Sequence, residues 1–323
     1  MKRTACLIFN PVAGQGNPEQ ELAQIQALLG DKFELDTQLT TPELDADEIA
    51  RQALRQGVDA LFVSGGDGTV SAAASAVMRT EIPLGVIARG TANAFANALG
   101  IPTTIEAACE TILKDQTKTI DVALCNGLPM VLLAGIGFEA ETVQKANREV
   151  KNRWGILAYV IAGLRQLREL EQFEAEIEAD DKIISVTASA LTVANAAPPT
   201  SILAQGPAGL DVSDGLLDLT IVAPANRTSA IAATYHLLQS ALSGAPTDRN
   251  DIGYLRSQRF KINTNPPQKV VLDGEMIGKT PIEVECISEG LTVFAPDPDA
   301  EIPTEKLEGL PDLVIEPKDS VDG

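Results

Sequence analysis

Short apolar runs and amphipathic stretches alternate over the first third of the chain. Apolar runs at 4–9, 60–63 and 83–87 predict buried strands. Stretches at 18–29, 45–56, 70–78 and 94–99 predict helices, and Gly57 is placed to end the second of them as its C-cap. The alternation continues to residue 118 and predicts an α/β domain with a parallel sheet at residues 1–118.

The pattern changes after residue 118, where strand-like segments dominate. They lie at 119–125, 129–134, 183–194, 216–223, 258–264, 268–273 and 281–287. Two helical stretches, 139–171 and 228–242, interrupt them. We expect a second, β-rich domain at residues 119–287, built as an antiparallel sandwich-like structure. A return of residues 288–296 to the first domain is left open.

The end of the chain has a composition of its own. Residues 297–323 hold nine acidic residues, two lysines and four prolines, which is typical of a solvated, poorly ordered tail. The whole chain has 25 Lys and Arg against 45 Asp and Glu, a net charge of −20. Because no basic footprint is present to displace counterions from phosphates, non-specific nucleic-acid binding is excluded.

Apolar runs and cysteines exclude two further classes of protein. The longest central apolar run, residues 154–164, is shorter than the about 20 residues of a membrane-spanning helix. The apolar stretch at the N-terminus is too short for a signal peptide. The four cysteines form no Cys-X-X-Cys pair, which argues against a disulfide framework or a zinc site. These features fit a cytoplasmic protein.

The strongest chemical signal is the run Gly-Gly-Asp-Gly-Thr at residues 65–69, between a predicted strand and a predicted helix. Glycines let the backbone approach a phosphate closely, and a helix N-terminus offers unpaired N–H groups. Asp67 repels a phosphate, so its carboxylate suits Mg²⁺ or a hydroxyl proton. A tight turn alone would need fewer glycines.

Two more loops of small residues follow predicted strands, at residues 10–16 and 89–93. Parallel strands bring such loops to the same edge of a sheet, where ligands bind in open α/β folds. Three loops that meet at one edge predict a phosphate site more strongly than any one of them alone.

Four segments together resemble a known family: Asn-Pro at 10–11 with Gly14, residues 65–69, residues 90–96 (Gly-Thr-Ala-Asn-Ala-Phe-Ala) and residues 273–275 (Asp-Gly-Glu). In this order, over residues 4–296, they resemble the diacylglycerol kinase catalytic family, and most closely its bacterial YegS/DagK-like lipid kinase branch. The run at 65–69 alone is less specific, since NAD kinases and phosphofructokinases carry similar loops. The resemblance implies an N-terminal nucleotide-binding domain like that of NAD kinases and phosphofructokinases.

The resemblance implies an ATP-dependent lipid kinase of phospholipid metabolism, with ATP and Mg²⁺ as cofactors. The γ-phosphate would pass to the hydroxyl of a diacylglycerol-like or sphingoid-like lipid. The implied proton acceptor is Glu275, with Asp67 supporting the metal and the developing charge. The implied nucleotide contacts are Asn10, Thr40, Gly65, Gly66, Asp67, Gly68, Thr69, Val70, Ser71 and Thr91. Thr40 is chosen over Thr41 because it lies five residues before residue 45, as in the family pattern.

Residues 210–218 resemble the magnesium loop of the family's second domain. The implied ligands are the Asp214 carboxylate and the main-chain carbonyls of Asp211 and Leu216, which would hold a structural metal separate from the one that accompanies ATP. An Asp- and Gly-rich turn before a strand is the alternative interpretation.

Two departures from the family pattern keep other functions open. Ala94 stands where many members have Asp, and Asn195 is followed by Ala-Ala-Pro-Pro rather than glycines. One alternative is a non-catalytic nucleotide-binding regulator, which would bind ATP without turnover. The other is a kinase for a soluble substrate such as NAD, which would act without lipid vesicles.

Three further features are assigned with less consequence for function. The basic segment at residues 139–170 is interpreted as an amphipathic helix that packs on the second domain, with contact to an anionic membrane surface as the alternative. We expect peripheral contact with membrane lipid substrate, and a homodimer is left open. Residues 135–140 match the dinucleotide-binding fingerprint, but they lie where antiparallel strands are predicted. A dehydrogenase is therefore disfavoured. His236, the single histidine, is interpreted as structural.

Overall fold

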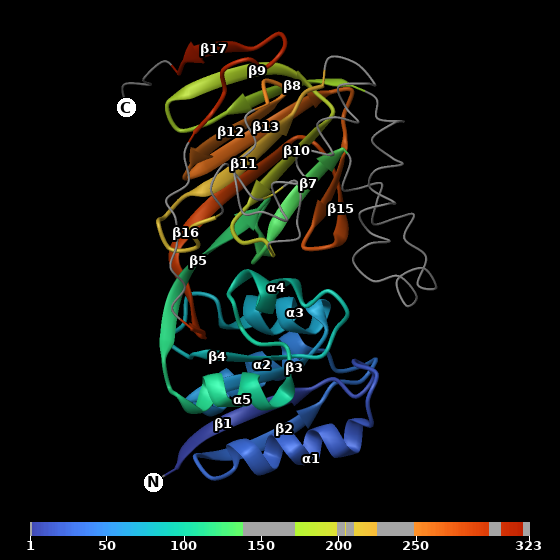
Figure 1. Cartoon of the computed structure of the whole chain (residues 1–323), viewed down its shortest axis with the longest axis vertical. Coiled ribbons are helices and arrows are strands. Elements are labelled where there is room, and N and C mark those ends of the chain that lie inside the picture. Colours follow the sequence, from blue (N-terminus) through green and yellow to red (C-terminus); the bar gives the residue numbers. More distant parts are fainter. Residues whose placement is uncertain are drawn as a thin grey trace. The chain divides into compact units, whose positions relative to one another are not determined.

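A computed structural model of the chain describes residues 2–137, 172–198, 204, 210–224, 249–296 and 305–318. The chain forms two compact units (Figure 1). The first consists of Met1–Val122 and Ser288–Asp299, and the second of Ala123–Ile287 and Ala300–Gly323. The sequence boundary expected at 118/119 lies four residues before this division. The predicted helices at 139–171 and 228–242, with the basic segment and His236, lie outside the described residues.

The first unit is built on a parallel sheet in the order β4-β3-β1-β2. Its strands are β1 (Arg3–Phe9), β2 (Phe33–Leu39), β3 (Ala60–Gly65) and β4 (Leu84–Ala88). Each neighbouring pair is parallel, and the end of β16 (Ile282–Phe294) adds a parallel contact to β4 at Val293–Leu84. The predicted α/β class with a parallel sheet is therefore confirmed.

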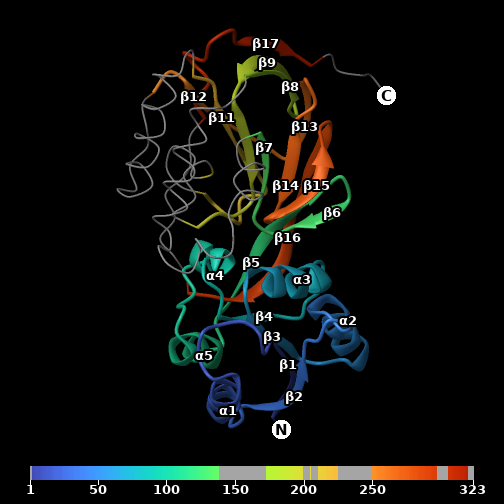
Figure 2. The ribbon, with the colours of Figure 1, turned by 90° about the vertical axis from the view of Figure 1, so that its right-hand side faces the viewer.

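Helices cover both faces of this sheet (Figure 2). They are α1 (Pro18–Leu29), α2 (Ala46–Gln56), α3 (Asp67–Val77), α4 (Ala94–Ala98) and α5 (Ile105–Leu113). One face carries α1 and α5, and the other carries α2 and α3. The rings of Phe33, Phe62 and Phe294 pack together in the core on the side of α1 and α5.

Local sequence signals fix the ends of these helices. The Asn17 side chain accepts hydrogen bonds from two amides of the first turn of α1, and Pro18 starts that helix. The Asp45 side chain caps α2, which ends at Gly57 in the left-handed region with φ 78°. The helix predicted from residue 70 begins three residues earlier, at Asp67, because Gly66 serves as the N-cap.

The second unit is a two-layer antiparallel β-structure, as predicted. One sheet has the order β12-β11-β10-β7-β14-β15. Its strands are β7 (Leu133–Gly137), β10 (Ala190–Ala194), β11 (Leu217–Val222), β12 (Ile252–Ser257), β14 (Lys269–Leu272) and β15 (Glu275–Lys279). The other layer contains β8 (Phe173–Glu178), β9 (Lys182–Ala188), β13 (Arg259–Asn265), the start of β16 and β17 (Val314–Pro317). Two connecting strands, β5 (Thr117–Cys125) and β6 (Leu128–Met130), form a hairpin.

Buried and exposed side chains alternate along the strands, and the buried ones form the core between these two layers. In β13, residues 260, 262 and 264 are buried and their neighbours are exposed. Phe260 and Ile262 join Ile136 and Leu219 of the facing sheet in one apolar cluster. This arrangement is the sandwich expected from the strand pattern.

The expectation of a poorly ordered tail is wrong for residues 305–318. Lys306 exchanges backbone hydrogen bonds with Tyr254, and β17 pairs antiparallel with β9. Leu310 is buried in the core of the second unit, with Leu307 and Leu313 packed against it. Three leucines at a spacing of three residues bury enough apolar surface to order a segment whose overall composition is acidic.

Candidate active site

The three predicted loops leave the same edge of the parallel sheet. Phe9 of β1 lies beside Ser64 of β3, and Gly65 lies beside Ala88 of β4. Backbone hydrogen bonds continue past the strand ends, from the Asn10 amide to the Ser64 carbonyl at 2.8 Å. Residue 40, after β2, is tied to this edge by the hydrogen bond from its amide to the Phe9 carbonyl at 3.0 Å.

Glycines at residues 65–68 serve two different purposes. A Cβ on Gly65 would lie 2.7 Å from the Thr69 Cβ, and a Cβ on Gly90 would lie 3.0 Å from the Gly66 Cα. Gly65 is therefore required by the position of Thr69 within the same loop, and Gly90 by the close approach of the second loop to Gly66. A Cβ on Gly68 would meet nothing within 4 Å, and Gly68 is exposed. The glycine that leaves room for a ligand is therefore Gly68, in the first turn of α3.

The start of α3 has the properties of an anion site. Its N-cap is Gly66, which has no side chain that could accept hydrogen bonds from the amides of the first turn. The helix has 11 residues, so its first-turn amides and dipole favour an anion at this end. Of the other predicted nucleotide contacts, Val70 lies in this turn and is buried, and Ser71 follows it and is partly exposed. Glycines, uncapped amides and open space at Gly68 together fit a bound phosphate chain.

Asp67 holds the second glycine loop against the first. Its carboxylate accepts hydrogen bonds from the Asn93 amide at 3.1 Å and from the Ala94 amide at 2.5 Å. Asn93 adopts a left-handed conformation with φ 49° that turns both amides into α4. Asp67 is thus a bridge between the loops, which sequence reasoning did not anticipate. A carboxylate has further lone pairs, so Asp67 can accept these two hydrogen bonds and still bind a metal. Its role toward the metal therefore stays a prediction.

The other predicted nucleotide contacts are placed around the same edge. The Asn10 side chain donates to the Thr69 hydroxyl at 2.8 Å and accepts from the Val12 amide at 3.1 Å. Thr91 is exposed in the second loop. The Thr41 hydroxyl accepts hydrogen bonds from the amides of residues 43 and 44, so it serves the turn before α2. This arrangement favours Thr40, the residue chosen from the sequence.

Sequence reasoning missed the role of Arg89, which ties the first loop in place. Its guanidinium donates to the Glu21 carboxylate at 2.7 Å and to the carbonyls of Asn10 at 3.0 Å and Ala13 at 2.8 Å. The group also stacks 4.2 Å from the centroid of the Phe9 ring. The residue is only 6% exposed, and each of its three guanidinium nitrogens contacts a protein oxygen. Its partners Glu21 and Asn10 lie 68 and 79 residues away in the sequence, so no local pattern indicates this role.

We expect Arg89→Met to lower the free energy of unfolding by about 3–5 kcal/mol, because it strands a carboxylate and two carbonyls without their donor. Urea denaturation followed by circular dichroism measures this change. Arg55→Met is the matched control, since Arg55 is an exposed arginine that contacts Glu48 on α2 and should cost far less. Equal losses in the two variants would contradict the assigned role of Arg89.

Glu275 stands at the start of β15, directly after a tight turn. Asp273 and Gly274 both have positive φ, 47° and 93°, and connect β14 to β15 as a two-residue hairpin. The partner of β14 in this hairpin is β15, a strand that none of the predicted strand segments covers. Glu275 is exposed, so its carboxylate is accessible to a substrate.

Asp273 fixes this turn and is a second residue whose role was missed. Its carboxylate accepts hydrogen bonds from the amides of Val131 at 2.8 Å, Leu132 at 3.0 Å and Leu133 at 2.9 Å. Burial raises the pKa of Asp273 to about 6, and the neighbouring Glu275 charge adds to the rise against the lowering effect of the three amides. Asp273 therefore positions the hairpin that presents Glu275.

The Asp214 carboxylate of the predicted magnesium loop is engaged by the chain itself. One oxygen of Asp214 accepts a hydrogen bond from the Leu216 amide at 3.0 Å, and the other pairs with the guanidinium of Arg256. The Asp211 carboxylate accepts from the amide and hydroxyl of Ser213, both at 3.0 Å. Within the described parts of the chain, no group of three or more His, Cys, Asp or Glu residues is placed to hold a metal. Both oxygens of the implied ligand are already engaged.

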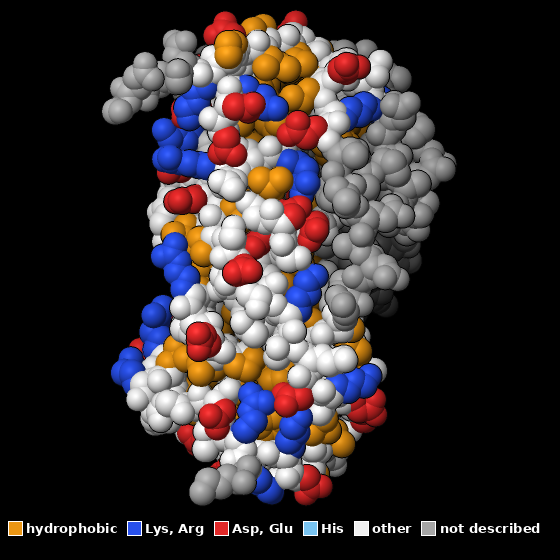
Figure 3. Space-filling model, turned by 90° about the vertical axis from the view of Figure 1, so that its left-hand side faces the viewer, with side chains coloured by type: hydrophobic (Ala, Val, Ile, Leu, Met, Phe, Trp, Pro, Cys, Tyr) orange, Lys and Arg blue, Asp and Glu red, His pale blue; other side chains and the backbone are white. Residues whose placement is uncertain are grey.

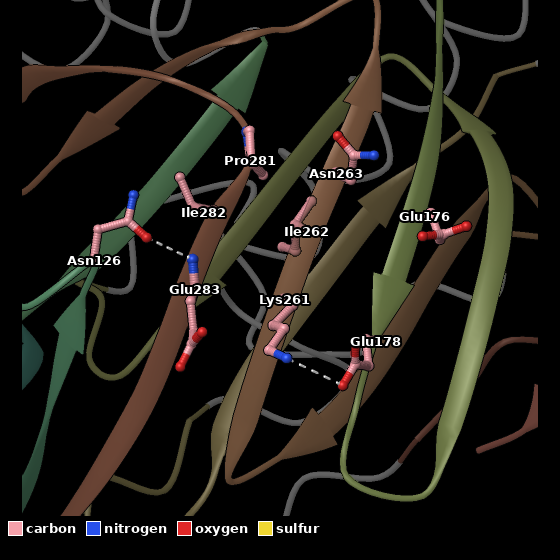
Figure 4. A pocket seen from close by; sticks show the side chains of 9 residues that line it. All are labelled: Asn126, Glu176, Glu178, Lys261, Ile262, Asn263, Pro281, Ile282 and Glu283. Atoms are coloured by element: carbon pink, nitrogen blue, oxygen red, sulfur yellow. Dashed lines mark hydrogen bonds and ion pairs between the residues drawn. The ribbon is translucent and has the colours of Figure 1, made fainter. Parts of the chain in front are cut away.

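A pocket of about 430 Å³ lies elsewhere in the second unit, on the outer face of β8, β13 and β16 (Figure 4). Its lining includes an ion pair of 3.6 Å between Lys261 and Glu178, and the Asn126 side chain that accepts from the Glu283 amide at 2.8 Å. It contains none of the predicted site residues.

On the face shown in Figure 3, acidic and basic side chains are interspersed. Among the described residues, no helix has the length and apolar character to cross a membrane.

Comparisons with known proteins cover most of the chain. Residues 4–125 match the family "Diacylglycerol kinase catalytic domain", and residues 133–295 match "YegS C-terminal NAD kinase beta sandwich-like domain". The protein named "Diacylglycerol kinase" of Bacillus subtilis is 32% identical over 307 residues, which cover 93% of this chain and 99% of that protein. The "Uncharacterized protein sll0036" of Synechocystis sp. is 48% identical over 305 residues, which cover 91% of this chain and 70% of that protein.

Solved structures agree on the fold. A crystal structure titled as a diacylglycerol kinase from Bacillus anthracis strain Sterne matches with a TM-score of 0.71 at 24% identity, and the match covers 91% of this chain and 97% of that one. At this identity the likeness supports the fold alone. Because both sequence segments match in the expected order and the Bacillus subtilis relative aligns along nearly its whole length, the chain belongs to the diacylglycerol kinase family, in its YegS/DagK-like branch.

Proposed function

We propose that this protein is an ATP-dependent lipid kinase that transfers the γ-phosphate of ATP to a lipid hydroxyl. The observation that carries the proposal is the bridge from the Asp67 carboxylate to the Asn93 and Ala94 amides. It joins two glycine loops beside the uncapped N-terminus of α3, which is the arrangement a phosphate chain needs. The relatives named diacylglycerol kinase support a lipid as the acceptor.

Each predicted residue has a defined task in the proposed reaction. Bound Mg²⁺–ATP would supply the phosphoryl group and neutralise its developing charge. The amides of the first turn of α3 hold the phosphates, and the Asn10–Thr69 hydrogen bond keeps the neighbouring loop in register with that turn. Glu275 accepts the proton of the lipid hydroxyl as the hydroxyl oxygen bonds to the γ-phosphorus and the bond from that phosphorus to ADP breaks, with ADP as the leaving group. Peripheral contact with a membrane surface would bring the lipid to the enzyme.

The test is transfer of radiolabelled γ-phosphate from ATP to lipids in mixed micelles. The panel holds diacylglycerol, a sphingoid base, phosphatidylglycerol and an isoprenoid alcohol, with NAD in a parallel reaction without lipid. We expect label in at least one lipid and none with Asp67→Ala, because that variant loses the bridge between the loops.

The other outcomes identify the rival functions. Label in NAD alone would indicate a kinase for a soluble substrate. ATP binding without label in any acceptor would indicate a non-catalytic nucleotide-binding regulator. That alternative draws on Ala94, whose methyl side chain supplies no carboxylate beside the second loop.

A further inference from the structure

The loop at residues 210–218 resembles a magnesium loop in sequence but meets an arginine in the structure. Three aspartates lie within eight residues of each other, at positions 211, 214 and 218. Asp218 in β11 lies directly opposite Arg256 in β12, in an antiparallel register. The carboxylates of Asp214 and Asp218 therefore face a cation that the chain itself provides.

Contacts of Arg256 are well defined and mostly buried. Its Nε lies 3.2 Å from the Asp218 Oδ1, and its Nη2 pairs with the Asp214 Oδ2. The side chain of Arg256 is 11% exposed and that of Asp218 is 6% exposed. The Arg256 amide also donates to the Glu305 carboxylate at 3.0 Å, which holds β12 beside the C-terminal segment. One guanidinium thus bridges the loop and the strand that follows it.

The Asp214 carboxylate has both oxygens engaged by the chain itself. Its Oδ1 accepts from the Leu216 amide within the turn, where Gly215 has φ 78°. Its Oδ2 pairs with the Arg256 guanidinium. A divalent ion near this oxygen would meet the guanidinium and its like charge.

We infer that Arg256 occupies the cation position of this loop, so that the second unit folds with an internal ion pair in place of a structural divalent metal. A guanidinium keeps its charge at every pH at which the protein folds, and its fork matches two carboxylates at once. Unlike a bound metal, it is not lost to dilution or to a chelator. The inference is independent of the proposed kinase activity.

Removal of the arginine should uncover a site for a hard divalent cation. In Arg256→Met the carboxylates of Asp214 and Asp218 lose the cation that they share, and carboxylate and carbonyl oxygens suit Mg²⁺ or Ca²⁺. The variant should therefore be destabilised without metal and recover when metal is added. Arg256→Lys keeps a positive charge at the same place and should show no such recovery.

Thermal unfolding of the full chain tests the inference without ATP or lipid. The wild type should keep its Tm within about 1 °C between EDTA and 10 mM MgCl₂ or CaCl₂. In EDTA, Arg256→Met should lose about 5 °C or more, and the divalent cations should restore most of that loss. Arg256→Lys should respond to the cations as the wild type does.

Two outcomes would overturn the inference. One is a wild type whose Tm falls in EDTA and recovers with Mg²⁺, a response that Asp214→Asn abolishes. The other is an Arg256→Met protein that is destabilised but insensitive to either cation. If Arg256→Met does not fold, Mn²⁺ binding to the wild type and to Asp214→Asn decides: a site lost in Asp214→Asn contradicts the inference, and equal binding supports it.

Discussion

Glu275→Gln should lower the rate of phosphate transfer to lipid by about 10²–10⁴-fold, the range expected for the loss of a general base. The amide has the size of the carboxylate but cannot accept a proton at neutral pH. Glu275 is exposed at the start of β15, and the turn before it is held by Asp273 rather than by Glu275. The substitution should therefore leave the hairpin and the affinity for ATP unchanged.

Initial rates with saturating ATP and micellar lipid measure this effect, and ATP affinity is measured separately by titration. Glu285→Gln is the matched control, because Glu285 is an exposed strand glutamate of the same unit. A Glu275→Gln enzyme as fast as Glu285→Gln would remove Glu275 from the proposed chemistry. A loss of ATP affinity in Glu275→Gln would instead place its carboxylate in nucleotide binding.

Local signals were sufficient to predict much of the first unit. Helix α1 occupies the predicted residues 18–29, and α2 has its predicted C-cap at Gly57. These features depend on neighbours in sequence, such as a capping side chain or a glycine that tolerates positive φ. The glycine loops were identified for the same reason, and the predicted family was confirmed.

Strands with one exposed face were harder to predict. In β8, the sequence Phe-Glu-Ala-Glu-Ile-Glu alternates buried and exposed positions and contains no continuous apolar run. In β15, every residue but one is exposed, so hydrophobicity gave no signal. Pairing with β14 across the Asp273–Gly274 turn orders β15 instead.

The positioning residues could not be predicted because their partners are distant in sequence. Arg89 binds a carbonyl 79 residues away, and Arg256 binds a carboxylate 42 residues away. Nothing in the local sequence shows that Asp214 has an arginine partner, so resemblance alone suggested a metal. The chemistry-bearing motifs are visible in the sequence, whereas the side chains that hold them are visible only after folding.

Asp67→Asn should lower the transfer rate by about 10²-fold, because the amide can hold only one of the two backbone donors that the carboxylate now accepts. Its NH₂ group would face the second N–H, and the loop at residues 90–94 would shift away from α3. Loss of a hydrogen bond to a charged group should also lower the free energy of unfolding by about 1.5–3 kcal/mol. Urea denaturation and initial rates measure the two effects.

The same variant separates two roles for Asp67. If the carboxylate acts chiefly as the bridge between loops, Asp67→Asn should weaken binding of ATP even without Mg²⁺ and should lose stability in the absence of any ligand. If it acts chiefly on the metal, stability should be unchanged and the Mg²⁺ concentration needed for half-maximal rate should rise. Asp31→Asn, an exposed aspartate between α1 and β2, is the control for the loss of one charge. The two backbone N–H groups that donate to Asp67 lead us to expect the first result.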